Sequence, residues 1–317
     1  MATKRRISDE KFWKSLTEGE YKEIIDFASQ RENELDVQIR DNCLNIYYEG
    51  GNLLKIYSES PYLDFDEFYF HRIHCGDVIL RKTHLKQKCK AGDKECMERW
   101  DSYIAQREKM LSLLKNSGGM AAYAAKMKEI MKEWKIDLGI SLSEKYAQQH
   151  ISMNNRGATD YTVIDVEYAV SRKSSFHYDN DGGLNKKLPR FDLVAVDTSG
   201  QLYVIELKTG LEAIDGNSGI RAHKDCFDYS IGLDSNNEFI KEMNELLRQK
   251  QELKLIEQNV CIDPTKKPQF IFAFSDKPKK NQDEEFVKKC KERRYQGKVI
   301  YVGNDYQFKF RKLTNMT

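Results

Sequence analysis

The sequence predicts an α/β fold in which a mixed central β-sheet is flanked by helices and preceded by an α+β amino-terminal module. Two runs rich in β-branched and aromatic residues, 191–196 and 202–207, stand on either side of a polar turn, which is typical of a β-hairpin. A third apolar run, 269–274, suits a buried strand of a mixed sheet. Apolar residues at helical spacing before and between these runs predict the flanking helices.

The overall composition indicates a folded globular protein. Its 317 residues suffice for one large domain or two ordinary ones, and 40% hydrophobic content with five prolines argues against a disordered or fibrous chain. With 52 basic and 50 acidic residues the net charge is +2, so contact with nucleic acid would have to use local patches.

The distribution of cysteines and apolar residues predicts the compartment. The seven cysteines lack paired spacing, the basic start has no apolar stretch behind it, and no run of 18 apolar residues occurs. We therefore expect a cytoplasmic protein with reduced thiols, no secretory signal and no membrane partner.

The amino-terminal module is predicted to contain helices and a β-meander. Residues 9–29 have helical spacing interrupted at Gly19, which predicts one broken helix or two short ones. Strands are expected at 35–40, 44–48 and 53–57, the last two forming a hairpin. A helical pattern over 94–134, divided at Gly118 and Gly119, predicts two antiparallel helices. We place a boundary near residue 136, giving an amino-terminal module at 1–136 and a second domain at 137–317.

The segment between the meander and these helices carries possible metal ligands and a basic run. His71, His74, Cys75, His84, Cys89 and Cys96 could form a zinc site, but they lack the Cys-x-x-Cys spacing of established zinc sites, and ordinary core or surface roles are the simpler interpretation. Arg81, Lys82, Lys86, Lys88 and Lys90 could contact nucleic acid or form a solvated face.

The second domain is predicted to begin with a helix and a strand. Ser141 or Ser143 can cap a helix that runs to about Met153, with Glu144 and Gln148 four residues apart on one side. The strand expected at 161–170 alternates, so one side would carry Ile164, Val166, Tyr168 and Val170, and the other Asp165 and Glu167. Further on, helices are expected at 220–231, 238–257 and 277–298, and strands at 299–302 and 308–310.

The hairpin brings acidic and basic residues together. Along its second strand Val204, Glu206 and Lys208 should share one face and Tyr203, Ile205 and Leu207 the other, giving an apolar face opposite one with an acid and a base. Folding the first strand back would place Asp192 close to Glu206. Two carboxylates about 4 Å apart repel by about 4 kcal/mol at an effective dielectric constant near 20, so a divalent metal is the expected reason for their proximity.

These residues resemble the motif of the PD-(D/E)XK nuclease superfamily, which has a restriction-endonuclease-like fold. Asp192 matches the Asp that begins the second strand of the family, and Glu206-Leu207-Lys208 matches its Glu-x-Lys. The Pro-Asp pair is not literal, because Pro189 is separated from Asp192 by two residues. The resemblance covers about residues 138–310. It implies that Asp192, Glu206 and the Leu207 carbonyl hold Mg²⁺ or Mn²⁺, and that Lys208 orients the attacking water or stabilises developing charge.

The resemblance also implies an accessory acid on the helix before the first core strand. Glu144 matches in order and element, although an exposed helix glutamate is the simpler interpretation, and Glu167 is a rival. Glu-x-Lys recurs at Glu20, Glu133 and Glu252, but these copies lie in helical patterns without a strand-borne Asp upstream. The alternative for the Glu206 copy is a surface hairpin with a Glu-Lys pair.

The predicted substrate contacts lie in the loop before the hairpin and in the helix after it. They are Arg172, Lys173, Lys186, Lys187, Arg221 and Lys224, with Tyr229 as a further candidate. The expected function is a metal-dependent nuclease hydrolysing phosphodiester bonds, with DNA favoured over RNA, possible homodimer formation and a restriction or defence role. The alternative is a non-catalytic nucleic-acid-binding or protein-interaction module on the same fold.

Overall fold

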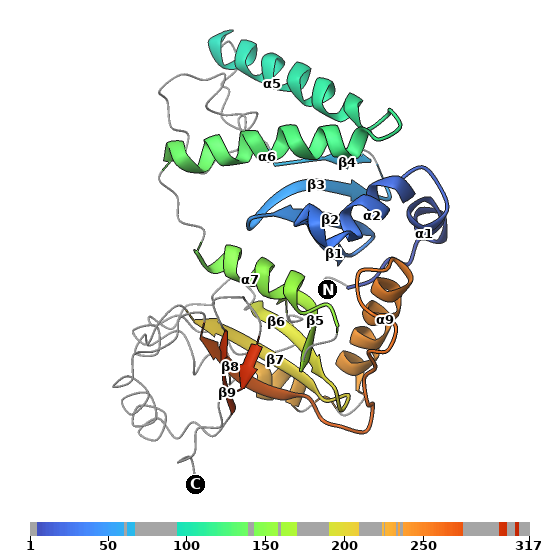
Figure 1. Ribbon diagram of the computed structural model, residues 1–317, viewed down its shortest axis with the longest axis vertical. Coiled ribbons are helices and arrows are strands. Elements are labelled where there is room, and N and C mark those ends of the chain that lie inside the picture. The colour runs from blue at the N-terminus through green and yellow to red at the C-terminus, as the bar shows by residue number, and fades with distance from the viewer. Residues whose placement is uncertain are drawn as a thin grey trace.

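The computed structural model shows a mixed α/β protein with two sheets and several helices (Figure 1), which confirms the predicted class at this level. The structure describes residues 5–59, 62–66, 94–138, 143–157, 160–169, 190–208, 224, 226–232, 234, 237–274, 298–302 and 308–310. Within these ranges, none of the helices has the length and apolar character needed to cross a membrane.

The amino-terminal module packs short helices against a four-stranded antiparallel sheet. Its elements are α1 (Glu10–Thr17), α2 (Lys22–Ser29), the 3₁₀ turn η1 (Arg31–Asn33), β1 (Asp36–Arg40), β2 (Cys43–Tyr48), β3 (Gly51–Tyr57) and β4 (Leu63–Asp64). The strands lie in the order β1-β2-β3-β4. Asp9 caps α1 by accepting a hydrogen bond from the Phe12 amide at 3.0 Å. The break near Gly19 and the three predicted strands are confirmed, whereas the short β4 was not expected.

Two long helices cover the outer side of this module (Figure 1). They are α5 (Lys94–Leu113) and α6 (Gly119–Leu138), separated at the predicted glycine pair. Tyr123 of α6 is fully buried and donates its hydroxyl hydrogen to the Leu53 carbonyl at 2.8 Å. Because this bond satisfies the tyrosine's polar end, a large aromatic side chain can anchor α6 on β3.

The second sheet has six strands in the order β10-β9-β8-β7-β6-β5. Its elements are α7 (Ser143–Asn154), β5 (Tyr161–Ala169), β6 (Arg190–Asp197), β7 (Leu202–Lys208), the π-helical turn η4 (Asp228–Gly232), α9 (Glu238–Glu252), β8 (Gln269–Phe274), β9 (Lys298–Val302) and β10 (Phe308–Phe310). Strands β5, β6 and β7 are antiparallel, β8 and β9 continue in parallel with β7, and β10 is antiparallel to β9. The predicted hairpin and mixed sheet are confirmed, and the predicted 277–298 helix lies outside the described residues.

Both faces of β7 are buried from Leu202 to Leu207, so the face expected to carry an acid and a base is not a solvent-exposed one. Leu202 and Val204 belong to the hydrophobic cluster on the α9 side, and Tyr203, Ile205 and Leu207 belong to the one on the α7 side. The alternation itself is confirmed. A strand buried on both sides is the usual condition where a sheet contains parallel pairs covered by helices.

The expected alternation along β5 is wrong. The register with β6 shifts between Val163 and Asp165, so a β-bulge interrupts the strand. Across the bulge Ile164 faces the α9 cluster and Val166 the α7 cluster, and Tyr168 faces the α9 cluster again after a second irregularity at Glu167, which has a positive φ. A bulge depends on the partner strand, so the alternation of residues along one strand could not reveal it.

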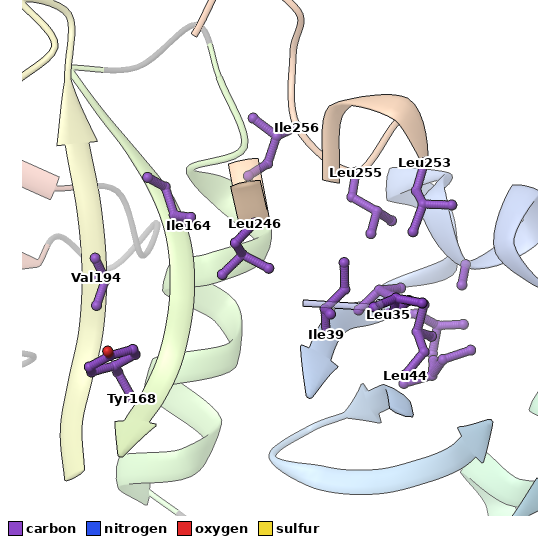
Figure 2. Close-up of a cluster of buried hydrophobic side chains, with 14 of the residues drawn as sticks. Leu35, Ile39, Leu44, Ile164, Tyr168, Val194, Leu246, Leu253, Leu255 and Ile256 are labelled. Atoms are coloured by element: carbon purple, nitrogen blue, oxygen red, sulfur yellow. The ribbon is translucent and has the colours of Figure 1, made fainter. Parts of the chain in front are cut away.

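One hydrophobic cluster continues from the amino-terminal module into the second sheet (Figure 2). On the core side it contains Ile164, Tyr168 and Val194 with Leu246 of α9, and on the module side it contains Ile39. The two sheets therefore share buried apolar surface across the expected boundary near residue 136.

Arginines of the amino-terminal segment cover the outer edge of β5. Arg40 donates to Asp165 Oδ1 at 2.6 Å and to the Val166 carbonyl at 2.7 Å. Arg5 Nε lies 3.1 Å from Asp165 Oδ2, and Arg5 Nη2 donates to the Glu167 carbonyl at 2.5 Å. Asp165 is completely buried. Because an edge strand presents unpaired backbone groups, these two arginines satisfy that edge and attach the module to the core.

A second buried polar network joins β1 to α7 and α9, which flank the core sheet. Ser152 of α7 donates to Asp36 Oδ1 at 2.9 Å, and Gln38 Nε2 donates to Asp36 Oδ2 at 2.8 Å. Lys250 of α9 donates to Gln38 Oε1 at 2.8 Å. All four side chains are buried. Since buried polar groups are costly unless they are hydrogen-bonded, this network specifies how the module sits on the core.

Candidate active site

The predicted acids lie where the ladder between β6 and β7 ends. Its last backbone pair is Leu193 with Ile205, although β6 extends back to Arg190 and β7 continues to Lys208. Continued by one residue, the same register sets Asp192 beside Glu206. The two strands thus form a fork with an acidic residue on each arm, and the proximity of the two carboxylates stays a prediction.

The Asp192 carboxylate occupies this fork. Its Oδ2 accepts a hydrogen bond from the Leu207 amide at 2.7 Å, so the side chain stands where a backbone carbonyl would continue the ladder. Its Oδ1 accepts from Gln148 Nε2 of α7 at 2.8 Å. Asp192 is 8% exposed. Hydrogen bonds to a buried carboxylate are charge-assisted, and together these two define the orientation of both oxygens.

Glu206 directly precedes Leu207, whose amide donates to Asp192, and its side chain is buried. It is 2% exposed, and its place on β7 follows from the pairing with β8, in which Glu206 lies opposite Phe272. A buried ionised carboxylate requires compensation by charge or hydrogen bonds. Glu206 is thus a second buried acid, on the strand next to that of Asp192.

Helix α7 lies over the fork because of its apolar face. Ala147 and Ile151 pack into the cluster formed by the α7 side of the sheet, and this rotation directs Gln148 toward Asp192. Glu144 lies four residues, about one helical turn, before Gln148 in α7. The side chains of Glu144 and Lys208 lie outside the described part of the structure, so their predicted roles stay predictions.

The rival acid, Glu167, is engaged with cations at the edge of the sheet. Its carboxylate lies 3.4 Å from Arg190 Nη1 and 4.0 Å from Lys145 Nζ. Glu167 has a φ of +49°, a conformation uncommon for a residue with a side chain, just beyond the β5 bulge. It lines a hollow whose wall also includes Gln148 and Gln149. Glu167 therefore belongs to the rim of the site, with two basic partners.

Most of the predicted substrate-contacting residues fall outside the described residues. Those are Arg172, Lys173, Lys186, Lys187 and Arg221, together with the side chain of Tyr229. Lys224 is described, and its amine forms an ion pair with Asp228 one turn later. The possible zinc ligands and the 81–90 basic run also lie outside the description, apart from the backbone of Cys96 in α5, so neither alternative is tested.

The donor set at the fork suits a hard divalent cation. Within the described ranges no group of three or more His, Cys, Asp and Glu side chains gathers as metal ligands. The predicted set is smaller, two carboxylates and the Leu207 carbonyl, and all its donors are oxygens of the kind that Mg²⁺ prefers.

Comparisons with protein-family models, with curated proteins and with solved structures give no match to this chain. The site is therefore interpreted from its own geometry.

Two features of the site were not predicted from the sequence. Gln148 was noted only as a neighbour of Glu144 on the helix, and its hydrogen bond to Asp192 depends on how α7 is rotated by packing. Asp165 was expected on the polar side of β5, whereas it is buried between two arginines. The sequence feature that could have indicated this burial is an acidic residue inside a long apolar strand, since such a residue needs a buried cationic partner.

Proposed function

We propose that this chain is a metal-dependent nuclease whose second sheet and flanking helices form a restriction-endonuclease-like core. The observation that carries the proposal is the fork between β6 and β7. There two buried acids stand on adjacent strands, and both oxygens of Asp192 are oriented by hydrogen bonds, one from the Leu207 amide and one from Gln148.

The order of elements supports the proposal. Helix α7 is followed by three antiparallel strands, β5, β6 and β7, and then by β8, which pairs in parallel with β7. This is the order that the resemblance to the PD-(D/E)XK superfamily implied, with Asp192 on the second strand and Glu206-Leu207-Lys208 closing the third.

Asp192, Glu206 and the Leu207 carbonyl would hold Mg²⁺ or Mn²⁺. When bound, such a cation lowers the pKa of a coordinated water and neutralises charge on a phosphate group. The protein's contribution is orientation and partial exclusion of water. Gln148 and the Leu207 amide keep the Asp192 carboxylate in place, so little rearrangement is needed on binding. Lys208 would stabilise charge on the phosphate, and Glu144 would position water.

The proposal is tested by a cleavage panel of single- and double-stranded DNA and RNA with Mg²⁺ or Mn²⁺. Asp192→Asn, Glu206→Gln and Lys208→Ala should each lower the cleavage rate by about 100-fold or more, because each removes a group from the reacting centre. Asp197→Asn is the matched control. Asp197 lies at the other end of β6, where its carboxylate accepts hydrogen bonds from the amides of Ser199 and Gln201 in the hairpin turn.

Cleavage that depends on the metal and on Asp192, but not on Asp197, would support the nuclease. Absence of cleavage on every substrate, together with absence of Mn²⁺ binding, would contradict it. That result would favour a non-catalytic binding module on the same fold.

A further inference from the structure

We infer that the amino-terminal module positions the Asp192 carboxylate, and that Gln149 of α7 is the positioning residue through which it does so. The hairpin turn between β2 and β3 clamps the Gln149 side chain. The preceding residue, Gln148, holds Asp192. Consecutive residues of one helix thus connect the module to the proposed site.

The Gln149 amide is bonded at both ends to the backbone of the module. Its Oε1 accepts a hydrogen bond from the Gly50 amide, and its Nε2 donates to the Tyr47 carbonyl at 3.1 Å and more weakly to the Glu34 carbonyl at 3.5 Å. Gln149 is 4% exposed. A buried side chain that bonds backbone groups on two segments defines position better than a surface contact, because breaking it leaves buried groups unsatisfied.

The turn itself is built to approach α7 closely. Gly50 has a φ of +79°, and a Cβ placed on it would lie 2.9 Å from the Tyr146 nitrogen and 3.0 Å from the Lys145 carbonyl carbon. A side chain at residue 50 would therefore displace the helix or the turn. This close backbone approach occurs within one helical turn of Gln148.

The rest of the same helix face also contacts the module. Ser152, three residues after Gln149, donates to Asp36. Arg156, seven residues after Gln149, donates to the Leu35 carbonyl and lies 3.7 Å from Asp36 Oδ1. The spacing of three and then four residues is that of one helical face. The module therefore contacts one whole side of α7 and its carboxyl-terminal extension.

The contacts at the site end of this face are hydrogen bonds made where the hairpin turn closely approaches the helix. Gly50, Gln148 and Gln149 also line a hollow between the turn, α7 and β5. Because the Gln149 side chain bonds backbone groups of the module, its hydrogen bonds help to determine where the first turns of α7 sit. Loss of the Gln149 contacts should therefore let the first turns of α7 shift, and the Gln148 bond to Asp192 should loosen with them.

The inference rests on the proposed function only where it concerns a bound metal. The mechanical part, that the module determines the place of Asp192, can be measured without one. Leu207 supplies the probe, because its amide is bonded to Asp192 Oδ2 and its hydrogen-exchange rate reports on that bond.

The test compares Gln149→Met with Gln249→Met in the full chain. Gln249 of α9 is the matched control, because its buried amide likewise accepts from a module amide and donates to a module carbonyl, both of Ile7, at 2.9 Å and 2.7 Å. Methionine keeps the length of the side chain and removes its hydrogen bonds. Leu207 amide exchange is followed by NMR or by mass spectrometry with residue resolution, and Mn²⁺ binding by electron paramagnetic resonance.

Gln149→Met should accelerate Leu207 exchange about tenfold, the effect of losing about one net hydrogen bond, and should weaken Mn²⁺ binding about tenfold. Gln249→Met should change either quantity less than about twofold, although it also removes two buried hydrogen bonds. Equal acceleration in both variants would show general loosening and overturn the inference, as would no acceleration in Gln149→Met.

A wild-type chain that binds no Mn²⁺ would contradict the proposed function, yet the exchange comparison would still decide the mechanical part. If Gln149→Met fails to fold, Gly50→Ala disturbs the same contact from the module side. Its Leu207 exchange is then compared with that of Gly118→Ala. Gly118 also has a positive φ, but a methyl group added there would meet no other atom within 4 Å.

Discussion

Lys250 of α9 and Gln38 of β1 share a hydrogen bond of 2.8 Å inside the interface between the core and the amino-terminal module. Lys250 is 2% exposed. Burial lowers the pKa of its amine to about 8, against the opposing influence of Asp36 and Asp165. The interface thus contains an ionisable group whose charge changes just above neutral pH.

This pKa predicts a pH-dependent effect of Lys250→Met. Because folding lowers the amine pKa from 10.5 to about 8, the unfolded chain binds more protons between these values, and the free energy of unfolding contributed by Lys250 rises with pH across that window. Relative to the variant, the wild type should gain about 2 kcal/mol between about pH 7 and about pH 9.5. Urea unfolding of both proteins at the two pH values measures this change, and a constant difference would contradict it.

The ion pair between Arg40 and Asp165 should be essential for stability. Burial lowers the pKa of the Arg40 guanidinium, but the combined influence of Asp165, Tyr47 and Glu167 raises it above its ordinary value, so the guanidinium stays charged. Arg40→Met would leave the fully buried Asp165 with one fewer cation and the Val166 carbonyl without its arginine donor. We expect a loss of about 3–5 kcal/mol in the free energy of unfolding, measured by chemical denaturation.

The control for this measurement is Lys22→Met. Lys22 and Asp26 form an ion pair whose two side chains are 45% and 48% exposed, so water and salt screen it. The variant should unfold at the wild-type denaturant concentration. Similar losses in both variants would mean that burial of the Arg40 pair is not what stabilises the interface.

The parts of the fold that could be predicted from sequence are those specified locally. The hairpin follows from two strand patterns and a polar turn, and its ladder ends at the pair of Leu193 with Ile205, one residue short of Asp192 and Glu206. The bulge in β5 could not be predicted, because it depends on pairing with β6. The partners of Asp165 could not either, since Arg40 lies 125 residues away in sequence. Gln148 was missed because helix rotation is determined by packing across the whole sheet.

Alanine substitutions at Gly50 and Gly118 separate two effects on stability, that of the positive φ and that of contact with α7. Both glycines have positive φ values, +79° and +69°, but only Gly50 has close neighbours. Gly118→Ala should cost about 1–2 kcal/mol for the left-handed conformation alone. Gly50→Ala should cost about 1–3 kcal/mol more, because its methyl group would press on the backbone of Tyr146. Thermal unfolding of the two variants tests this, and equal losses would exclude a tight contact with the helix.

Substitution of Asp192 should separate metal binding from stability. In Asp192→Asn the asparagine Oδ1 can still accept from the Leu207 amide. Its Nδ2 can donate to Gln148 Oε1 once the side-chain amide of Gln148 has flipped. In Asp192→Ala both partners lose their acceptor, and a buried amide without one costs about 1–3 kcal/mol. Without metal, Asp192→Asn should therefore unfold close to the wild-type temperature and Asp192→Ala well below it.

Added Mn²⁺ should distinguish the wild type from both variants. At about 100 times its dissociation constant, a ligand that binds only the folded state adds about 2.7 kcal/mol to the free energy of unfolding. The wild-type unfolding temperature should rise with Mn²⁺ and return when the metal is chelated, whereas both variants should stay unchanged because the Asp192 charge is absent. A rise in Asp192→Asn equal to that of the wild type would place the cation elsewhere in the protein, since a neutral amide is a much weaker ligand for a hard cation than a carboxylate.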